Sequence, residues 1–272
     1  MSTEPIQINR IIRPMRGAGK SFFVQGRDDC FYVAKFSNNP QGTRTLINEW
    51  IVGQLLTHLR VSTPPVKILT LEGCPEGGEK LYFTLENKRR MIEGRLHFGS
   101  QCPVNPEKKA IYDFLPSRLL PLVVNVTHFA TMLVFDKWVG QVDARQSIFV
   151  RESGARGESV FRSYFIDHGL SFAGNRWAFE DAPGYGQYMN CAVYSSINLA
   201  QHTRQVLSSL DAITETHIYD AAGTVPLEWF SKTDETALAH LLRSLHRRRD
   251  RLPLLVDACI RNISLQTESL MG

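Results

Sequence analysis

The pattern of hydrophobic residues changes character near residue 100, and this change limits the folds that the chain can adopt. Short runs of aromatic and β-branched residues, separated by turn residues, dominate the first part, whereas longer stretches with helical spacing dominate the rest. This order is typical of an α+β protein with two lobes, and 272 residues suffice for two lobes with a shared cleft. We therefore predict a β-rich lobe over residues 1–98 and a mainly helical lobe over residues 99–272.

Strands and one helix are predicted in the first lobe. The runs SFFV (21–24) and CFYVAKF (30–36) are β-rich, and turn residues separate them, so they predict a hairpin. Apolar residues with helical spacing predict a helix over Thr43–Leu59, which the prolines of STPPV end. The runs VKILTL (66–71) and KLYFTLE (80–86) predict further strands, so the lobe is expected to hold a small antiparallel sheet and one helix.

Helices are predicted through most of the second lobe. NPEKKAIYDFL (105–115) and VNVTHFATMLVFDKWV (124–139) have helical spacing, and a loop-rich section with two short strand-like runs, SIFV and SYFI, follows them. Further helices are expected around residues 201–214, 232–249 and 252–263.

A glycine-containing stretch, RGAGKS, resembles a phosphate-binding loop. In the motif G-x-x-x-x-G-K-[ST], the glycine that should precede Gly19, Lys20 and Ser21 falls on Pro14. Ser21 also leads into a predicted strand rather than a helix, and no apolar strand is expected before Gly17, so we exclude a P-loop NTPase. Two interpretations stay open: an ordinary turn with a surface lysine, or a loop between two strands that covers phosphates.

Five polar residues occur in an order that favours the second interpretation. Lys35 lies in a predicted strand and Glu49 in the predicted helix, and such an ion pair can hold a phosphate-binding lysine in one conformation. Asp143 and Gln146 lie in a short connection, and Asp167 follows an apolar strand. Each alone is typical of a surface or turn position, but two carboxylates in neighbouring loops can share a divalent cation and an attacking hydroxyl.

Several short motifs in this order resemble those of the HipA-like kinases, which are atypical relatives of the protein-kinase and phosphoinositide-kinase fold. The chain is similar to a compact bacterial group of the family, and the resemblance covers about residues 16–194. It rests on AKF (34–36), INEW (47–50), HFGS (97–100), FDKWVGQVDARQ (135–146), IDHG (166–169) and PGYGQY (183–188).

The resemblance implies a role for each of the five residues. Lys35 would neutralise phosphates with Glu49 as its ion-pair partner. Asp143 would orient the acceptor hydroxyl, as the catalytic residue, whereas Gln146 and Asp167 would bind the metal.

The resemblance also implies a two-lobed protein-kinase-like fold with ATP and Mg²⁺ as cofactors. A glycine loop over the phosphates would contain Gly17, Gly19, Lys20 and Ser21, and a hinge at about Gly94 to Gly99 would offer backbone groups to adenine. The expected activity is phosphoryl transfer to a protein serine or threonine.

Three positions depart from the family pattern. Gln141 stands where related sequences often carry Asn, Gln146 replaces a metal-binding Asn, and His168 replaces Phe. Two alternatives therefore stay open: a non-catalytic nucleotide- or partner-binding module on the same fold, and a kinase for small molecules or lipids. The chain is also too short for the extra subdomain of the larger HipA toxins, so no toxin role carries over.

Composition and charge limit the partners and the cellular compartment that we expect for this protein. The net charge of +4 is mild, so nucleic acid is not an expected partner. The basic run HRRRDR (246–251) is read as a solvated helix end, with an RNA or acidic-partner patch as the alternative. The chain has no signal-peptide pattern and no apolar run near the ~20 residues that cross a bilayer, and its five cysteines are dispersed. We expect a cytoplasmic protein with reduced thiols and no membrane contact.

Overall fold

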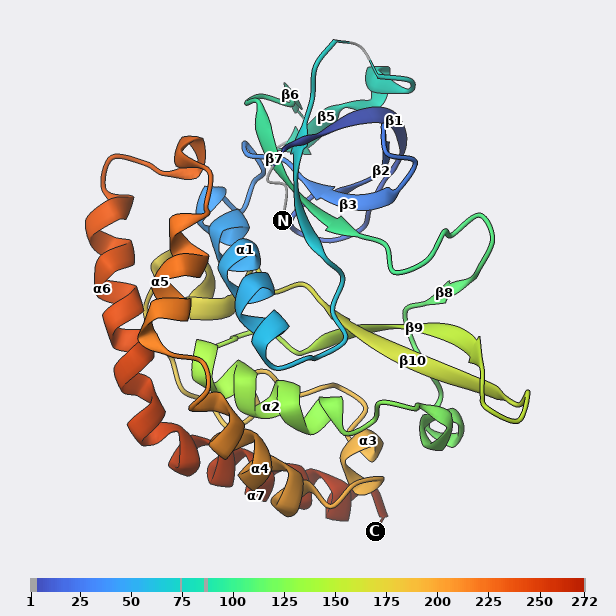
Figure 1. Cartoon of the computed structure of the whole chain (residues 1–272), viewed down its shortest axis with the longest axis vertical. Helices are drawn as coiled ribbons and strands as arrows, with labels where there is room; N and C mark the ends of the chain where they lie inside the picture. Colours follow the sequence, from blue (N-terminus) through green and yellow to red (C-terminus); the bar gives the residue numbers. More distant parts are fainter. Residues whose placement is uncertain (1–3, 74, 86–87, 272) are drawn as a thin grey trace.

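A barrel of strands lies beside a larger helical lobe in the computed structural model, which describes residues 4–73, 75–85 and 88–271 (Figure 1). The barrel order is β1–β2–β3–β7–β4, and neighbours are antiparallel except that β1 and β4 run parallel. The prediction of a small antiparallel sheet is therefore corrected by one parallel pair, which closes the barrel. The barrel strands are β1 (Ile6–Pro14), β2 (Phe22–Gly26), β3 (Phe31–Lys35), β4 (Val66–Thr70) and β7 (Leu96–Gln101).

The barrel forms because alternate side chains fill its interior. In β2, Phe22 and Val24 are buried inside, whereas Phe23 and Gln25 point to the other side, as the two-residue period of a strand requires. A hairpin of β5 (Tyr82–Leu85) and β6 (Lys88–Met91) covers the barrel and adds Phe83 to its core. The short 3-10 helix η1 (Gly78–Lys80) precedes this hairpin.

The helix α1 (Thr43–His58) belongs to the helical core although it follows the barrel strand β3. Its residues Leu46 and Trp50 pack in the same hydrophobic cluster as the helical lobe. The Trp50 Nε1 donates to Thr224 Oγ1 at 2.9 Å, and Figure 1 shows α1 beside α5 (Glu215–Gly223). The helix α1 is therefore packed against the second lobe, and this packing fixes the position of its side chains relative to that lobe.

The helical lobe is organised around α2 (His128–Val139), which is buried on nearly all sides, as expected for a helix in the centre of a lobe. The strands β9 and β10 pair antiparallel at its edge, and β8 adds to β9. The remaining elements are β8 (Ile111–Tyr112), β9 (Gln146–Ser153), β10 (Ser159–Ile166), α3 (Ala192–Ser195), α4 (Leu199–Leu210), α6 (Asp234–Arg247), α7 (Leu252–Met271), η2 (Ser117–Leu122), η3 (Ser171–Arg176), η4 (Leu227–Trp229) and η5 (Arg248–Arg251).

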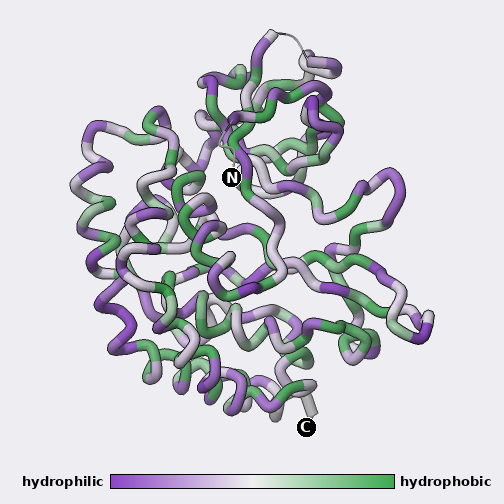
Figure 2. Tube along the Cα trace, in the orientation of Figure 1, coloured by the Kyte–Doolittle hydropathy of each residue, from purple (hydrophilic) through white to green (hydrophobic). Residues whose placement is uncertain are grey.

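One predicted helix is wrong. Residues 105–115 form a turn followed by β8, whose Tyr112 pairs with Phe149 of β9, because strand pairing outweighs the local helical spacing. The loop between β7 and β8 is hydrophilic and projects from the body of the molecule (Figures 1 and 2). The proposed division between residues 98 and 99 falls inside β7.

The basic run at 246–251 is more than a solvated helix end. Arg248 is buried, forms an ion pair with Asp181 and lies over the Phe179 ring. Arg249 stacks on Trp138 at 4.9 Å. These arginines are therefore part of the packing of the second lobe.

Two further sequence predictions concern cysteines and membranes. Cys30, Cys102, Cys191 and Cys259 are free thiols, and Cys74 lies outside the described residues. Among the helices of the described ranges, none combines the length and apolar character needed to span a bilayer.

Candidate active site

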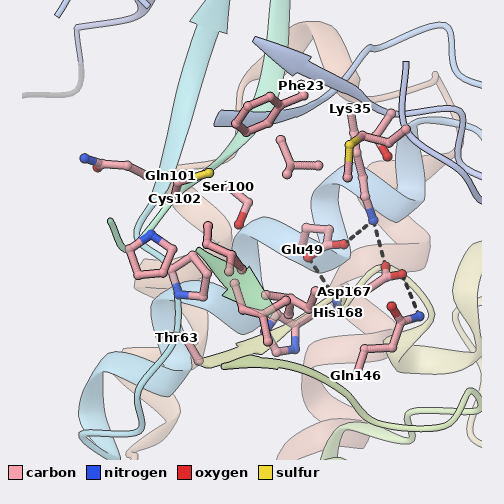
Figure 3. Close-up of a pocket in the computed structure, with 18 of the residues that line it drawn as sticks. Phe23, Lys35, Glu49, Thr63, Ser100, Gln101, Cys102, Gln146, Asp167 and His168 are labelled. Atoms are coloured by element: carbon pink, nitrogen blue, oxygen red, sulfur yellow. Dashed lines mark hydrogen bonds and ion pairs between the residues drawn. The ribbon is translucent and has the colours of Figure 1, made fainter. Parts of the chain in front are cut away.

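Lys35, at the end of β3, joins two carboxylates that are far away in the sequence. Its Nζ lies 2.5 Å from Glu49 Oε1 of α1 and 2.7 Å from Asp167 Oδ1, just after β10 (Figure 3). Burial disfavours the charge on Lys35, but the two carboxylates outweigh burial and raise its pKa above the ordinary value. The ion pair predicted from sequence therefore exists, and the lysine is held charged by two partners.

Glu49 holds both the lysine and the segment that follows β10. Its Oε2 accepts a hydrogen bond from the backbone N–H of His168 at 3.0 Å, and its side chain is almost fully buried. Burial is the largest effect on this carboxyl and raises its pKa, whereas Lys35 and the His168 N–H oppose that rise. Glu49 thus fixes Lys35 and the residue after Asp167 in one arrangement.

Asp167 ends the strand β10 in a left-handed backbone conformation, with φ of 61°. Burial would raise the pKa of its carboxyl, but the ion pair with Lys35 dominates and lowers the pKa to about 2. Gln146 Nε2 donates to Asp167 Oδ2 at 3.1 Å, and Gln141 Nε2 donates to the Asp167 carbonyl at 3.0 Å. The two glutamines that depart from the family pattern therefore both contact this aspartate.

The residue in the Phe position of the family pattern is a buried, neutral histidine. Burial, followed by the nearby Arg145, lowers the pKa of His168 well below its ordinary value. Its Nδ1 lies 3.2 Å from Arg145 Nη1. His168 therefore adds no positive charge to the site.

Asp143, three residues before Gln146, is exposed and does not line the cavity described below. Its carbonyl accepts from the Gly186 N–H at 3.1 Å, and its Oδ1 accepts from the Ala144 N–H at 2.8 Å. A buried ion pair fixes the loop that contains Asp143. In this pair, Arg145 donates two hydrogen bonds of 2.8 and 2.6 Å to the Asp136 carboxylate. Asp136 of α2 therefore anchors this loop, with Arg145 as its partner.

A cavity of about 420 Å³ extends from the Lys35 cluster between the two lobes (Figure 3). Its inner end is polar and charged, with Lys35, Glu49, Asp167 and Gln146, whereas the rest combines apolar walls with a few further charged side chains, Arg13, Arg16 and Asp113. A cavity of this size and character suits a nucleotide, since such sites combine apolar walls with a few polar groups. The apolar walls include Phe23, Val33, Val66, Phe98, Ile148 and Phe165.

The glycine loop connects two barrel strands, but it contributes less to the cavity than predicted. The expectation that no apolar strand precedes Gly17 is wrong, because β1 precedes it. Of the four predicted loop residues, Ser21 lines the cavity, whereas Gly17, Gly19 and Lys20 are not among its lining residues. Lys20 lines a separate hollow beside β5.

The predicted hinge is also displaced. Residues Leu96–Gln101 form β7 in the middle of the barrel, where Ala34 pairs with Gly99. The chain leaves the barrel after this strand, and Gln101, Cys102 and Pro103 line the cavity. The backbone that could meet a nucleotide base is therefore at residues 101–103 rather than 94–99.

The residues at the charged end fit a magnesium ion. Mg²⁺ prefers hard oxygen ligands and keeps several waters, so the Asp167 carboxylate and the Gln146 amide oxygen could hold it together with phosphate oxygens. In the described part of the chain, no cluster of three or more His, Cys, Asp or Glu side chains could hold a metal by itself. The donor set therefore fits an ion that is shared with a bound phosphate.

Asn48 is the site residue that the sequence analysis missed. Its side chain is fully buried and its Nδ2 donates to the carbonyls of Gly169, Ser171 and Gly174 at 2.9 to 3.1 Å. The only signal in the sequence is its place beside Glu49 in INEW, on a helix otherwise rich in apolar residues.

These features define a two-lobed kinase-like protein. Comparisons with known proteins identify its family. A family model described as HipA-like kinase matches residues 8–252, so the chain belongs to the HipA-like kinase family. Comparison with the sequences of curated proteins finds no significant match.

Comparison with solved structures finds similar chains. The proinflammatory kinase CtkA of Helicobacter pylori is 13% identical, with a TM-score of 0.56 over 96% of this chain and 99% of that chain. Two structures of the Golgi casein kinase, one with Mn/ADP bound, cover 94% of this chain and 74% of theirs. Their identities are 10% and 12%, with TM-scores of 0.48 and 0.46. The likeness to CtkA establishes a shared fold, and the family supports a kinase function.

Proposed function

We propose that this protein is an ATP- and Mg²⁺-dependent phosphotransferase whose acceptor is a serine or threonine of another protein. The observation that carries the proposal is the convergence of Lys35, Glu49 and Asp167 at the charged end of a nucleotide-sized cavity. Phosphoryl transfer needs mainly charge neutralisation and alignment, and these residues offer a fixed ammonium and a carboxylate that can hold a metal ion.

The inner residues would bind and orient the phosphates. Lys35 would donate to phosphate oxygens, and Glu49 would keep the ammonium in place. Asp167 and Gln146 would hold Mg²⁺, which supplies positive charge for the phosphates when it is bound. Because the pKa of Asp167 is about 2, its carboxylate is available as a ligand at neutral pH.

Asp143 would accept or orient the proton of the acceptor hydroxyl. Its carboxylate is exposed, and the neighbouring Arg145–Asp136 pair fixes its loop. An exposed position can be reached by a residue on the surface of a protein, which favours a protein acceptor over a small molecule enclosed in the cavity.

Transfer of labelled γ-phosphate from Mg²⁺–ATP, with autophosphorylation included, tests the proposal. We expect Asp143→Asn and Asp167→Asn each to lower the rate by at least about 10²-fold, and Asp257→Asn, an exposed control, to leave it unchanged. Equal rates in all four proteins would contradict the assignment. Transfer to small molecules or lipids but not to protein would replace only the acceptor.

A second function, nucleotide binding without catalysis, is favoured by two observations. Asp143 does not line the cavity, and the Gln146 amide is engaged with Asp167, as a nucleotide-binding module without catalysis would allow. Thermal stabilisation by Mg²⁺–ATP without any phosphate transfer would support this function instead.

A further inference from the structure

The charge at the inner end of the cavity does not suffice for a polyphosphate. Lys35 contributes one positive charge and its partners Glu49 and Asp167 two negative charges, which leaves a net charge of −1. The nearby Arg145 is neutralised by Asp136 in a fully buried pair. A nucleoside triphosphate brings about four further negative charges, and one Mg²⁺ offsets only two of them. The cavity therefore needs more cations than its predicted residues supply.

Two arginines at the end of β1 and the start of the following loop could supply them. Arg13 and Arg16 both line the cavity, together with Met15 between them. Both are exposed, and among the described residues neither guanidinium has an ion-pair partner. Unpaired arginines beside a cavity with a negative inner end are suited to an anionic ligand that extends outward.

The geometry favours these arginines over the lysine of the glycine loop. The Arg13 guanidinium lies 5.6 Å from the centre of the Phe23 ring, which forms part of the cavity wall. Lys20 instead lines the hollow formed with Tyr82 and Thr84, on another side of the loop. A guanidinium can also bind two phosphate oxygens at once, which an ammonium does less well.

We propose that Arg13 and Arg16 bind the polyphosphate of the nucleotide, and that the cationic role expected of Lys20 belongs to them. This inference rests on the proposed function only in so far as the cavity holds a nucleotide. The contribution of the two arginines to binding affinity should depend on the number of phosphates of the ligand and not on its base.

Calorimetric titration with Mg²⁺–ATP and with adenosine tests the inference. We expect Arg13→Gln and Arg16→Gln each to weaken ATP binding by roughly tenfold, and the double variant to weaken it further. Adenosine affinity should change less than about twofold, because adenosine lacks the phosphates. Lys20→Gln, which removes one positive charge from the loop that follows β1, is the matched control and should leave both affinities unchanged.

The outcomes separate this inference from the proposed function. If the wild-type protein binds ATP but the arginine variants bind it equally well, or if Lys20→Gln causes the larger loss, the inference is wrong and the proposed function stands. An equal loss for adenosine and ATP would also overturn it, since the arginines would then support the cavity wall. If the wild-type protein binds no nucleotide, both fail.

Discussion

The indole N–H of Trp177 donates to the side-chain oxygen of Asn48 at 2.8 Å, which ties the segment after Asp167 to the helix that carries Glu49. The Asn48 amide group donates to three carbonyls of the same segment. Glu49 makes a fifth connection through the His168 N–H. The helix that carries Glu49 and the segment that follows Asp167 therefore form one hydrogen-bonded unit.

Replacement of Asn48 should loosen this unit. We expect Asn48→Ala to lower the free energy of unfolding by about 2–4 kcal/mol, because it leaves buried carbonyls and the Trp177 N–H without partners. Phosphate transfer should also fall at temperatures where the variant is still folded. Urea denaturation and single-turnover assays measure the two effects. The exposed Asn9→Ala is the control and should stay within about 0.5 kcal/mol of wild type. A stable but inactive Asn48 variant would contradict the structural part of this prediction.

The Lys35–Glu49 pair should show strong coupling. Lys35→Met leaves the buried Glu49 carboxylate without its cation, so we expect a loss of about 3–5 kcal/mol in the free energy of unfolding. Glu49→Gln in the Lys35→Met background should recover part of this loss, because it removes the uncompensated charge. A double-mutant cycle from denaturant unfolding measures the coupling, and additive losses would show that the pair contributes nothing of its own.

The sequence predicts the parts of the site whose local context is clear. The hairpin that ends at Lys35, the helix that carries Glu49 and the strand before Asp167 each have a regular hydrophobic pattern. Their order along the chain matches a known family, so their convergence could be expected. Asn48 could not, because its partners are backbone groups more than a hundred residues away.

The sequence does not predict the strands β1 and β7, and each has a physical reason for this. In β1 the register shifts twice, so the buried residues Ile8 and Ile11 are three positions apart and no alternation is visible. In β7 the residues His97, Phe98 and Gly99 are all buried, and a Cβ at Gly99 would lie 2.7 Å from the Leu69 side chain. A strand in the middle of a barrel lacks the alternating pattern that identifies half-buried strands. The displaced hinge follows from this missed strand.

Lys137 should hold the segment next to Asp143. Its buried Nζ donates to the carbonyls of Ala182 and Pro183, each at 2.9 Å, and to that of Tyr185. We expect Lys137→Met to leave these carbonyls unpaired and to speed hydrogen exchange of residues 182–188 by at least about tenfold. Hydrogen-exchange mass spectrometry measures this, with the exposed Lys232→Met as control. Unchanged exchange in Lys137→Met would show that other contacts suffice.

His97 should make stability depend on pH. Its ring is fully buried against Phe36 and its Nδ1 lies 3.3 Å from the Ser37 N, while burial lowers its pKa from 6.5 to about 4. The unfolded chain therefore binds more protons than the folded chain between these values. The stability that neutral His97 contributes is complete above about pH 6.5 and is lost as the pH falls towards 4, by on the order of 2–3 kcal/mol.

Replacement of this ring isolates its contribution, since buried His168 also favours the neutral form and shifts stability in the same direction. His97→Phe keeps the volume of the ring but cannot be protonated, so its free energy of unfolding should fall less steeply between pH 6.5 and 4 than that of wild type. Urea denaturation at several pH values measures the two slopes, and His240→Phe, at an exposed position, should leave the wild-type slope unchanged. If His97→Phe loses stability as steeply as wild type, protonation of His97 is not the cause of the loss.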